Sequence, residues 1–429
     1  MSVLLLTNQL FDFEIIKHAI KEDVKYITIY DSPTFYKVNK QPVSHTKMTY
    51  FIACLSEYVK HIRSACQIKI VKSLNNLFDK CDFVHFFDPL DHDLEKEITS
   101  LKCTVVKHNT PALLISTIDR VNYSSGKSFV FANFYKTFRQ RLNIFPKPNG
   151  GKWSYDEDNQ SSLPKNIDIP TITEIHFPTN RKESLRWLDS FIRNKLKHFG
   201  KYQDAMSDKN LILYHAGISP MLNMGLLVPQ DVISRIPRDW PPAYRASYEG
   251  FLRQLFWREY MAMVYYADIP IKNIFHSNVA LPKSWFSEAK EITKIQCIDK
   301  KINQAVRYGY LHHIERLMLV GNFMLLAQFK PIDVYTWFMC LFVDAHHWVM
   351  HANVYHMLLW SSGRVVTGRP YIASSTYLHR MSEITPEDMN KWDRIYARFV
   401  LRNIKTLSHT YLISGHIKKA KQIMKEKNK

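Results

Sequence analysis

Five short apolar runs separated by helical patterns in residues 1–110 constrain the fold of this chain more than any other feature. The runs lie in SVLLLTNQL, YITIYDS, CQIKIVKS, CDFVHFFDP and CTVVKHN, and the segments FDFEIIKHAIKE and HTKMTYFIACLSEYVKHI between them have the spacing of amphipathic helices. Strands that alternate with helices predict a doubly wound parallel α/β sheet covered on both faces. The chain has no GxGxxG, so the usual NAD-binding fingerprint is absent.

The remainder of the chain has a different character. The segment PKPNGGKWSYDEDNQSSLPKNIDIP is rich in turn-forming residues and predicts a long connection. Almost everything after it has helical spacing, including the long stretches KINQAVRYGYLHHIERLMLVGNFMLLAQF and VYTWFMCLFVDAHHWVM. We therefore predict an α/β domain at residues 1–125, an interdomain linker at 126–182 and a helical domain at 183–429. The lysine-rich end IKKAKQIMKEKNK is expected to be a solvated, fraying segment that attracts phosphates nonspecifically.

Charge and cysteine content narrow the partners and the setting. The formal net charge is +19, from 58 Lys and Arg against 39 Asp and Glu. Such a surplus favours nucleic acid first and an anionic membrane surface second, although a lysine-rich composition without any partner is the plain alternative. The six cysteines form no CxxC pair, and no apolar run is long enough to span a membrane. We expect a soluble, intracellular, monomeric protein.

Two segments of the helical region combine polar and aromatic residues. In LYHAGISPMLNMGLLVP, His215 and Ser219 precede an apolar helix, an arrangement that can hold a diphosphate or can simply cap a helix. In YEGFLRQLFWREYM, Arg253 and Trp257 share a helix face and Arg258 follows. These residues suit a charged cofactor or a nucleic-acid backbone, but a salt-bridged amphipathic helix has the same pattern.

Two further segments concentrate histidines. In RYGYLHHIERLMLVGNF, His312 and His313 are adjacent in a predicted helix, with Arg316 one turn further on. Their imidazoles point about 100° apart on a helix, so at least one leaves the apolar stripe, and imidazole suits proton transfer. The ordinary alternative is a hydrogen-bonded core histidine. The segment VDAHHWVMHANVYHM contains Asp344 and Asn353 among four histidines, but without HExxH we predict no metal site.

Five colinear segments resemble the bacterial iron–sulfur branch of the photolyase/cryptochrome family, often labelled photolyase-related proteins, which includes (6-4) photolyases. The similar segments are TNQL, DSPTFYKVNKQPVSHTKM, FYKTFRQRLNIFPKPNGGKWSYDEDNQSSLP, GYLHHIERLMLVGNFMLLAQFKPIDVYTWF and GRPYIASSTYLHRMS. The resemblance implies an N-terminal antenna-type domain, a helical domain that binds FAD, and UV-damaged DNA as partner. In that family, reduced flavin passes an electron to a flipped-out pyrimidine pair under light.

The resemblance also implies roles for particular residues. His313 would donate a proton to the lesion with support from His312, and Trp337 would neighbour the flavin in an electron-transfer chain. Asp31 stands where an antenna-contacting glutamate is usual, so a lumazine-type antenna chromophore could bind there. The residues implied for FAD binding are His215, Ser219 and Asn223 near its phosphates, and Arg253, Trp257, Arg258, Asp344 and Asn353 around its flavin.

The chain departs from the family at the iron–sulfur cluster. Cys297 matches the first of four cysteine ligands, but EITPEDMNKWDRIY stands where the other three are expected. One cysteine cannot hold a cluster that requires four thiolates, so we predict that iron is absent. The replacement predicts a helix start instead, with Thr385 as cap, Pro386 in the first position, and Glu387 and Asp388 at the positive end.

The electron route and the flavin surroundings also differ from the family. Phe338 replaces a tyrosine, no tryptophan occurs near Ala289 although Trp285 lies one turn away, and Met350 stands where a glutamate is expected. The leading hypothesis is a (6-4) photolyase without the cluster. The alternatives are a cryptochrome-like blue-light receptor that binds FAD without repair, and a nucleic-acid-binding scaffold that has lost FAD.

Overall fold

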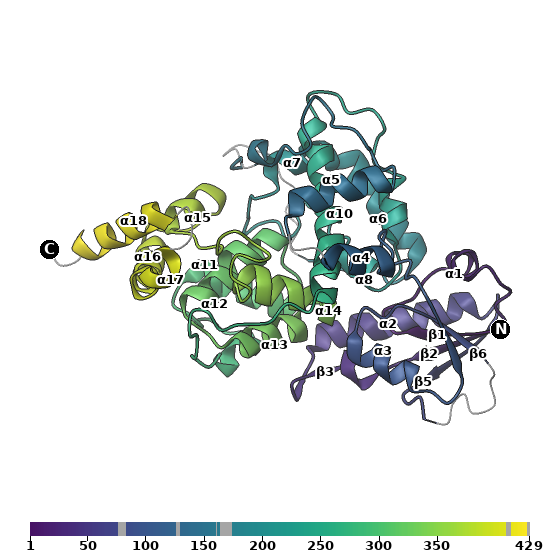
Figure 1. The fold of residues 1–429 in the computed structure, drawn as a ribbon. Helices are drawn as coiled ribbons and strands as arrows, with labels where there is room; N and C mark the ends of the chain where they lie inside the picture. Colours follow the sequence, from purple (N-terminus) through teal and green to yellow (C-terminus); the bar gives the residue numbers. More distant parts are fainter. Residues whose placement is uncertain (76–82, 126–128, 160, 164–173, 409–412, 427–429) are drawn as a thin grey trace.

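The computed structural model describes residues 1–75, 83–125, 129–159, 161–163, 174–408 and 413–426 (Figure 1). Residues 126–128, 160 and 164–173 of the predicted linker lie outside the described residues, as do Cys81 and the last three residues of the predicted C-terminal segment.

The N-terminal part contains the predicted doubly wound sheet. Its five parallel strands lie in the order β5-β2-β1-β6-β7, and β1 pairs with β2 from Ser2 opposite Tyr26 to Leu6 opposite Tyr30. All five strands coincide with the apolar runs of the sequence. The strands are β1 (Ser2–Leu6), β2 (Tyr26–Tyr30), β5 (Gln67–Val71), β6 (Phe83–Phe87) and β7 (Thr104–His108).

Successive residues of β1 serve opposite faces of the sheet, as the pleat requires. Val3 and Leu5 are fully buried in the cluster that includes α1 (Phe13–Ile20) and α2 (His45–Ile62). Leu4 and Leu6 pack on the other side with α3 (His92–Thr99). Both faces are therefore covered at β1, which explains why this central strand is apolar from Val3 to Leu6 instead of alternating.

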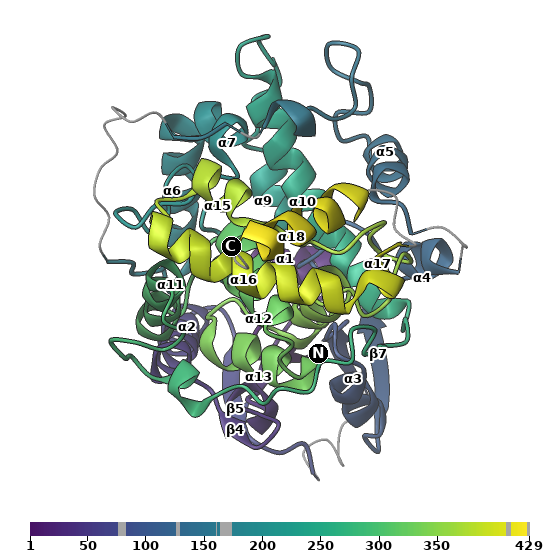
Figure 2. The same ribbon diagram turned by 90° about the vertical axis from the view of Figure 1, so that its left-hand side faces the viewer.

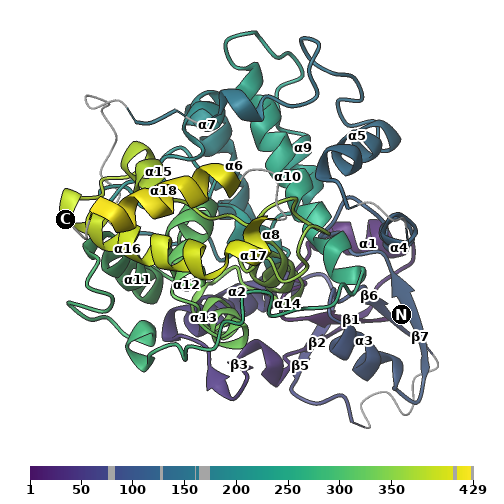
Figure 3. The same cartoon turned by 60° about the vertical axis from the view of Figure 1, so that its left-hand side comes forward.

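Helices make up most of the remaining chain, and α10 runs through its centre (Figures 1 and 3). A two-stranded hairpin, β3 (Lys37–Val38) and β4 (Gln41–Pro42), projects from the N-terminal domain. No helix among the described residues is both long enough and apolar enough to cross a membrane. The further α-helices are α4 (Thr117–Ser124), α5 (Phe131–Arg141), α6 (Arg181–Asn194), α7 (Leu196–Tyr202), α8 (Ser219–Asn223), α9 (Pro229–Ile233), α10 (Arg245–Tyr266), α11 (Gln296–Tyr308), α12 (Asn322–Leu326), α13 (Pro331–Leu341), α14 (His347–Met350), α15 (Ser375–Met381), α16 (Pro386–Arg402), α17 (Ile404–Ser408) and α18 (Ile413–Glu426).

The prediction of one continuous helix over residues 301–329 is wrong. Helix α11 ends at Tyr308, and Gly309 adopts the left-handed conformation with φ of 60°. A Cβ at this glycine would lie 2.8 Å from Cγ1 of Val343, so the chain passes too close to its neighbour for any side chain. Helical structure resumes at His313 and continues as a π-helix, η4 (Glu315–Gly321).

The predicted helix over residues 334–350 is also interrupted. Helix α13 ends at Leu341, and Phe342 is extended with ψ of 130°. After the short α14, a second π-helix, η5, covers His351–Leu358. Gly321 of η4 packs so tightly against Leu358 of η5 that no Cβ fits between them. π-Helices are rare and often occur at functional sites, and these two flank the cavity described below.

As predicted, a helix begins where the cluster loop is expected. Thr385 caps α16 by accepting a hydrogen bond from the Asp388 amide, and Pro386 occupies the first position. The buried Asp388 carboxylate also accepts a hydrogen bond of 3.1 Å from the Cys297 amide. A hydrogen bond thus joins the two segments that carry the four thiolates in the family.

The C-terminal prediction of a fraying end is wrong for the described residues. Helix α18 lies along α16 at the end of the molecule farthest from the sheet (Figures 1 and 2). Ala420 is fully buried in the interface, and the Tyr396 hydroxyl lies 2.7 Å from Nδ1 of His416. Packing against α16 explains why a lysine-rich segment remains helical.

One buried lysine joins the two domains next to the cavity. The Lys47 ammonium group, on α2, donates hydrogen bonds to the carbonyl oxygens of Met339 at 2.7 Å and Ala345 at 2.8 Å. Burial lowers the pKa of Lys47 to about 8, so the group remains largely charged at neutral pH. The N-terminal domain thereby holds in place the loop that carries Asp344.

Candidate functional site

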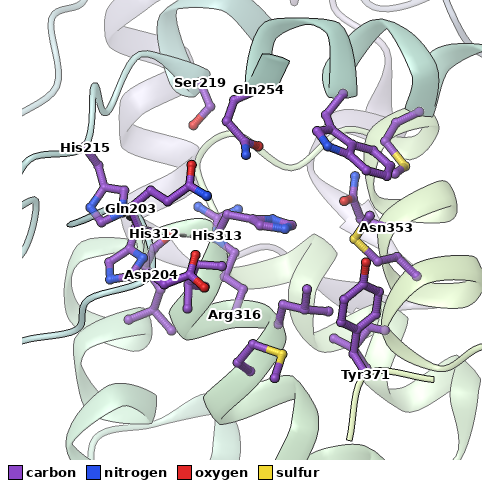
Figure 4. Close-up of a pocket in the computed structure, with 18 of the residues that line it drawn as sticks. Gln203, Asp204, His215, Ser219, Gln254, His312, His313, Arg316, Asn353 and Tyr371 are labelled. Carbon is purple, nitrogen blue, oxygen red and sulfur yellow. Dashed lines mark hydrogen bonds between the residues drawn. The ribbon is translucent and has the colours of Figure 1, made fainter. Parts of the chain in front are cut away.

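A large cavity of about 880 Å³ lies between α10, the segment around α8, and the two π-helices (Figure 4). This volume is in the upper part of the range for small-molecule and cofactor sites. The structure brings together all ten residues that sequence analysis assigned to FAD binding and proton transfer. These lining residues are His215, Ser219, Asn223, Arg253, Trp257, Arg258, His312, His313, Asp344 and Asn353.

Asp344 forms hydrogen bonds with several polar residues of the cavity wall. Its carboxylate accepts a bidentate pair of hydrogen bonds from Arg316, at 2.8 and 3.0 Å, and one from the Ser219 hydroxyl at 2.6 Å. The Asn223 amide donates to the Asp344 carbonyl oxygen at 2.8 Å. Because the carboxylate is only 5% exposed, this network fixes the relative positions of three separate segments of chain.

The arginines of α10 are committed to protein partners as well. Arg258 donates to the Asn223 side-chain oxygen at 2.9 Å and to the Ala112 carbonyl oxygen at 2.6 Å. Burial lowers its pKa to about 10, at which it stays charged. Arg253 pairs with Asp156 at 2.8 Å and with Glu249 at 3.3 Å. These arginines would therefore reach a ligand by sharing donors or by exchanging partners.

His215 occupies a more enclosed place than the resemblance suggests. Its ring nitrogens lie 2.9 and 2.8 Å from the carbonyl oxygens of Ile212 and Gln203. Burial, followed by the nearby His312, lowers its pKa to about 3, so the ring is neutral at pH 7. Since both nitrogens face backbone carbonyls, His215 can present only its ring to a ligand. The Ser219 hydroxyl likewise already donates to Asp344. Helix α8 is too short for its dipole to provide a phosphate site.

The two adjacent histidines have distinct surroundings. His312 stacks on His215 with ring centroids 4.0 Å apart, and its Nε2 lies 3.4 Å from the Glu315 carboxylate. Glu315 also pairs with the buried Lys301 at 2.7 Å. Burial alone would raise the pKa of Glu315, but His312 and Lys301 outweigh burial and hold it at about 2. His312 is therefore locked at the cavity wall.

Unlike His312, which is packed into the cavity wall, His313 projects into the cavity. Figure 4 shows its ring pointing toward the middle of the cavity, and its side chain is exposed to that space. The cavity is deep, so surrounding protein still desolvates the ring. This desolvation, together with the charges of Arg316 and His312, lowers the pKa of His313 to about 4. In the protein alone the ring is neutral at pH 7, and a polyanionic ligand would raise its pKa.

Trp337 does not line the cavity but lies directly behind it. It contacts the lining residue Phe338 at 5.0 Å between ring centroids. On its other side lies Trp285, at 5.9 Å, whose carbonyl oxygen accepts a hydrogen bond from the Trp337 indole. The tryptophan that sequence analysis placed one turn from the expected position therefore does reach Trp337, although both indoles are buried.

Asp31 does not line the cavity. Its Oδ1 atom accepts hydrogen bonds from the hydroxyls of Thr7 at 2.8 Å and Tyr36 at 2.7 Å. The residue is 7% exposed, so only Oδ2 remains for an antenna chromophore. Antenna binding by Asp31 stays a prediction, testable by the absorbance of any chromophore released from the purified chain.

Some lining residues were missed by sequence reasoning. Asp204 and Gln254 face the same space as His313, and Arg369, Tyr371 and His416 enter from the C-terminal part. Burial, followed by the Asp156 charge, raises the pKa of Asp204 to about 6. Gln254 follows Arg253 in a helical segment that sequence analysis had already noted, so its place at the site could have been recognised from sequence. Arg369 and Tyr371 lie in the GRPYIASSTYLHRMS segment of the resemblance, although no role was assigned to them, whereas Asp204 and His416 carried no signal, because only tertiary structure brings them there.

The buried His356 leads to a stability prediction. It lies on η5, fully buried, and neither ring nitrogen has a hydrogen-bond partner in the described part of the chain. Burial lowers its pKa to about 4, while the unfolded chain binds the proton near pH 6.5. The unfolded state therefore gains protons first as the pH falls from 6.5 to 4, and stability declines in that window.

We expect His356→Leu to remove about 2 to 3 kcal/mol of the stability loss between pH 7.5 and 4.5. Urea unfolding at both pH values measures this difference. The exposed His18→Leu on α1 is the control. An acid sensitivity that is the same in the His356 variant as in the wild type would refute the assignment.

Among the described residues, no group of three or more His, Cys, Asp or Glu side chains could hold a metal ion. Cys297 itself is buried, and burial raises the pKa of its thiol to about 12. The thiol is thus protonated at neutral pH. Iron content remains to be measured on the purified chain.

Comparison with known proteins identifies relatives. Residues 3–206 match the family described as deoxyribodipyrimidine photo-lyase-related protein. The chain is 31% identical to a (6-4) photolyase of Agrobacterium fabrum over 299 residues, which cover 61% of this chain and 58% of that protein. A stretch of 88 residues is 41% identical to the uncharacterized protein R855 of Acanthamoeba polyphaga mimivirus, covering 20% of this chain and 72% of that protein.

Two solved structures share the fold at low sequence identity. A bacterial class III photolyase from Agrobacterium tumefaciens superposes with a TM-score of 0.62 at 14% identity, covering 97% of this chain and 91% of that one. A cryptochrome of Synechocystis sp. PCC6803 superposes with a TM-score of 0.63 at 12% identity, covering 94% and 88%. The predicted resemblance is confirmed: the chain is related to the photolyase-related proteins and has the photolyase/cryptochrome fold.

Proposed function

We propose that this photolyase-related chain is a light-driven DNA repair enzyme that binds FAD in the central cavity and acts on (6-4) photoproducts. The observation that carries the proposal is the position of His313. Its imidazole projects into the same cavity whose walls carry every residue assigned to FAD. A proton-transfer group therefore lies next to a cofactor-sized space. Repair of a lesion beside a flavin requires this arrangement.

The residues of the cavity suit FAD. A flat ring system and a diphosphate need apolar walls together with positively charged and amide donors. The apolar walls include Leu222, Met350 and Met357, and the donors include Arg253 and Gln254. When bound, reduced FAD would supply the light-driven electron. The chain's own residues would enclose it, exclude water and hold a proton at His313.

The chain's charges also suit DNA as substrate. Two exposed arginines, Arg369 and Arg380, line the cavity where it opens to solvent. Together with the overall charge of +19, they would attract the phosphate backbone without sequence preference. A nucleotide flipped out of the duplex could then enter beside His313.

The decisive experiment is a repair assay. The purified chain is reduced and illuminated with blue light together with an oligonucleotide that carries a (6-4) photoproduct, and restored thymines are quantified. The proposal expects light-dependent repair, release of FAD on denaturation and no stoichiometric iron. A colourless protein that releases no flavin would instead support a nucleic-acid-binding scaffold.

A cryptochrome-like blue-light receptor is the second candidate. Phe338 in place of a tyrosine and Met350 in place of a glutamate alter the surroundings of the ring site, and both line the cavity. A chain that binds FAD but repairs neither (6-4) nor cyclobutane lesions would favour the receptor. Repair of cyclobutane dimers alone would keep the enzyme class and change the lesion.

A further inference from the structure

The opening of the cavity has a basic border that the proposed chemistry does not use. Arg369, Arg380 and His416 line the cavity and are wholly or partly exposed. Of the two carboxylates nearby, Asp156 pairs with Arg253, whereas Asp204 is hydrogen-bonded by Tyr377 and interacts with the charges of Arg253 and Arg380. The positive charge of this border is therefore only partly offset from within the cavity.

Helix α18 extends the border, and it is held rigidly. The Lys419 ammonium group donates hydrogen bonds to the hydroxyls of Ser374, at 2.8 Å, and Thr376. Both hydroxyl residues line the cavity. Together with the buried Ala420 and the bond between His416 and Tyr396, these contacts fix one face of α18 against the protein.

The opposite face of α18 presents a row of lysines. Lys418, Lys421 and Lys425 are all exposed and follow one another at spacings of three and four residues. Residues at this spacing lie on one side of a helix, and the row spans about 10 Å along its axis. Four consecutive phosphates of one DNA strand cover a similar axial length, at about 3.4 Å per nucleotide. The row therefore matches a short stretch of strand in both charge and length.

We propose that the lysine face of α18 binds the phosphate backbone of the damaged strand beside the nucleotides that enter the cavity. Helix α18 is a positively charged helix at the cavity opening. It is anchored to the loop that carries Ser374, so its position relative to the cavity is fixed. This inference rests on the proposed function, because it takes damaged DNA as the partner. It assigns to residues 413–426 a positioning role.

The test compares two double variants of the full, FAD-loaded chain that lose the same charge. Lys418→Gln/Lys421→Gln removes two lysines of the α18 face. Lys25→Gln/Lys102→Gln removes two exposed lysines of the N-terminal domain, at the opposite end of the molecule (Figure 1). Fluorescence anisotropy in the dark measures the affinity for a labelled duplex with one (6-4) lesion, from about 50 to about 200 mM salt.

We expect the α18 variant to bind at least about 10-fold more weakly, and the dependence of log Kd on log salt to fall by about 2. The N-terminal variant should bind with nearly wild-type affinity and salt dependence. Circular dichroism checks that α18 remains helical. Once bound at saturating protein, the α18 variant should repair the lesion at the wild-type rate, because its lysines lie outside the cavity.

The outcomes separate this inference from the proposed function. If the wild type repairs the lesion but both double variants bind equally well, only the role of α18 is refuted. If the wild type binds DNA through α18 yet repairs nothing, the α18 contact stands and the repair function fails. A wild type without measurable DNA binding would overturn both.

Discussion

Replacing His313 with alanine is expected to lower light-driven (6-4) repair by at least about 100-fold while flavin content stays near the wild-type level. The ring projects into the cavity and forms no hydrogen bond with the described residues, whereas its neighbour His312 is enclosed by His215 and Glu315. Removing it should cost little stability and leave the Asp344 network intact. Single-turnover repair with FAD absorbance on the same sample measures both effects.

The pH dependence of wild-type repair gives an independent readout. The pKa of His313 is lowered to about 4 in the protein alone, so only a small fraction is protonated at pH 7. If the imidazolium donates the proton, the repair rate of the bound complex should rise as the pH falls from about 8 to about 6. His379→Ala, at an exposed position of α15, is the matched control. A His313→Ala variant that repairs at the control rate would exclude the proton-donor role.

The α/β domain could be predicted from sequence because its signals are local. Each strand is a short apolar run, and α2 begins after the cap Ser44, whose side chain accepts a hydrogen bond from the Lys47 amide. The helix start at Thr385 was predictable for the same reason, since cap, proline and acidic residues are adjacent in sequence. Such features depend on a few neighbouring residues and survive without knowledge of the rest of the fold.

The breaks in the long helices were not predictable in this way. The three-four pattern continues through Gly309 and Phe342, yet both helices end there. The break at Gly309 results from a close approach to Val343, whose amide also donates to the Gly309 carbonyl oxygen at 3.0 Å. A contact between residues far apart in sequence thus overrides local periodicity.

For the candidate site, sequence predicted which residues converge but not how they bond. The resemblance supplied Ser219 and Asp344 as separate cofactor residues, whereas the structure joins them directly by a hydrogen bond. It assigned His215 to phosphates, yet both of its ring nitrogens face carbonyl oxygens. Side-chain pairing depends on the three-dimensional environment, so a motif can identify a residue without specifying its partner.

Asp344 should be the residue on which the cavity depends most. In Asp344→Ala, Arg316 loses both hydrogen bonds of its bidentate pair, while its guanidinium stays 4.2 Å from the Phe342 ring. Breaking a buried ion pair by removing one partner typically costs about 3 to 5 kcal/mol. We expect a loss of this size in the free energy of unfolding by urea, and a decrease in bound FAD of more than about 10-fold.

A double-mutant cycle separates the ion pair from other effects of the substitution. Arg316→Met removes the charge that Asp344→Ala leaves unpaired, so the double variant should recover about half or more of the lost stability. Bound FAD should not recover in that variant, because Ser219 still lacks the Asp344 carboxylate, and the loop whose Asp344 carbonyl oxygen accepts from Asn223 is no longer fixed by it. Additive stability losses in the double variant would show that Asp344 and Arg316 act independently. Wild-type FAD content in Asp344→Ala would show that the network does not shape the cofactor site.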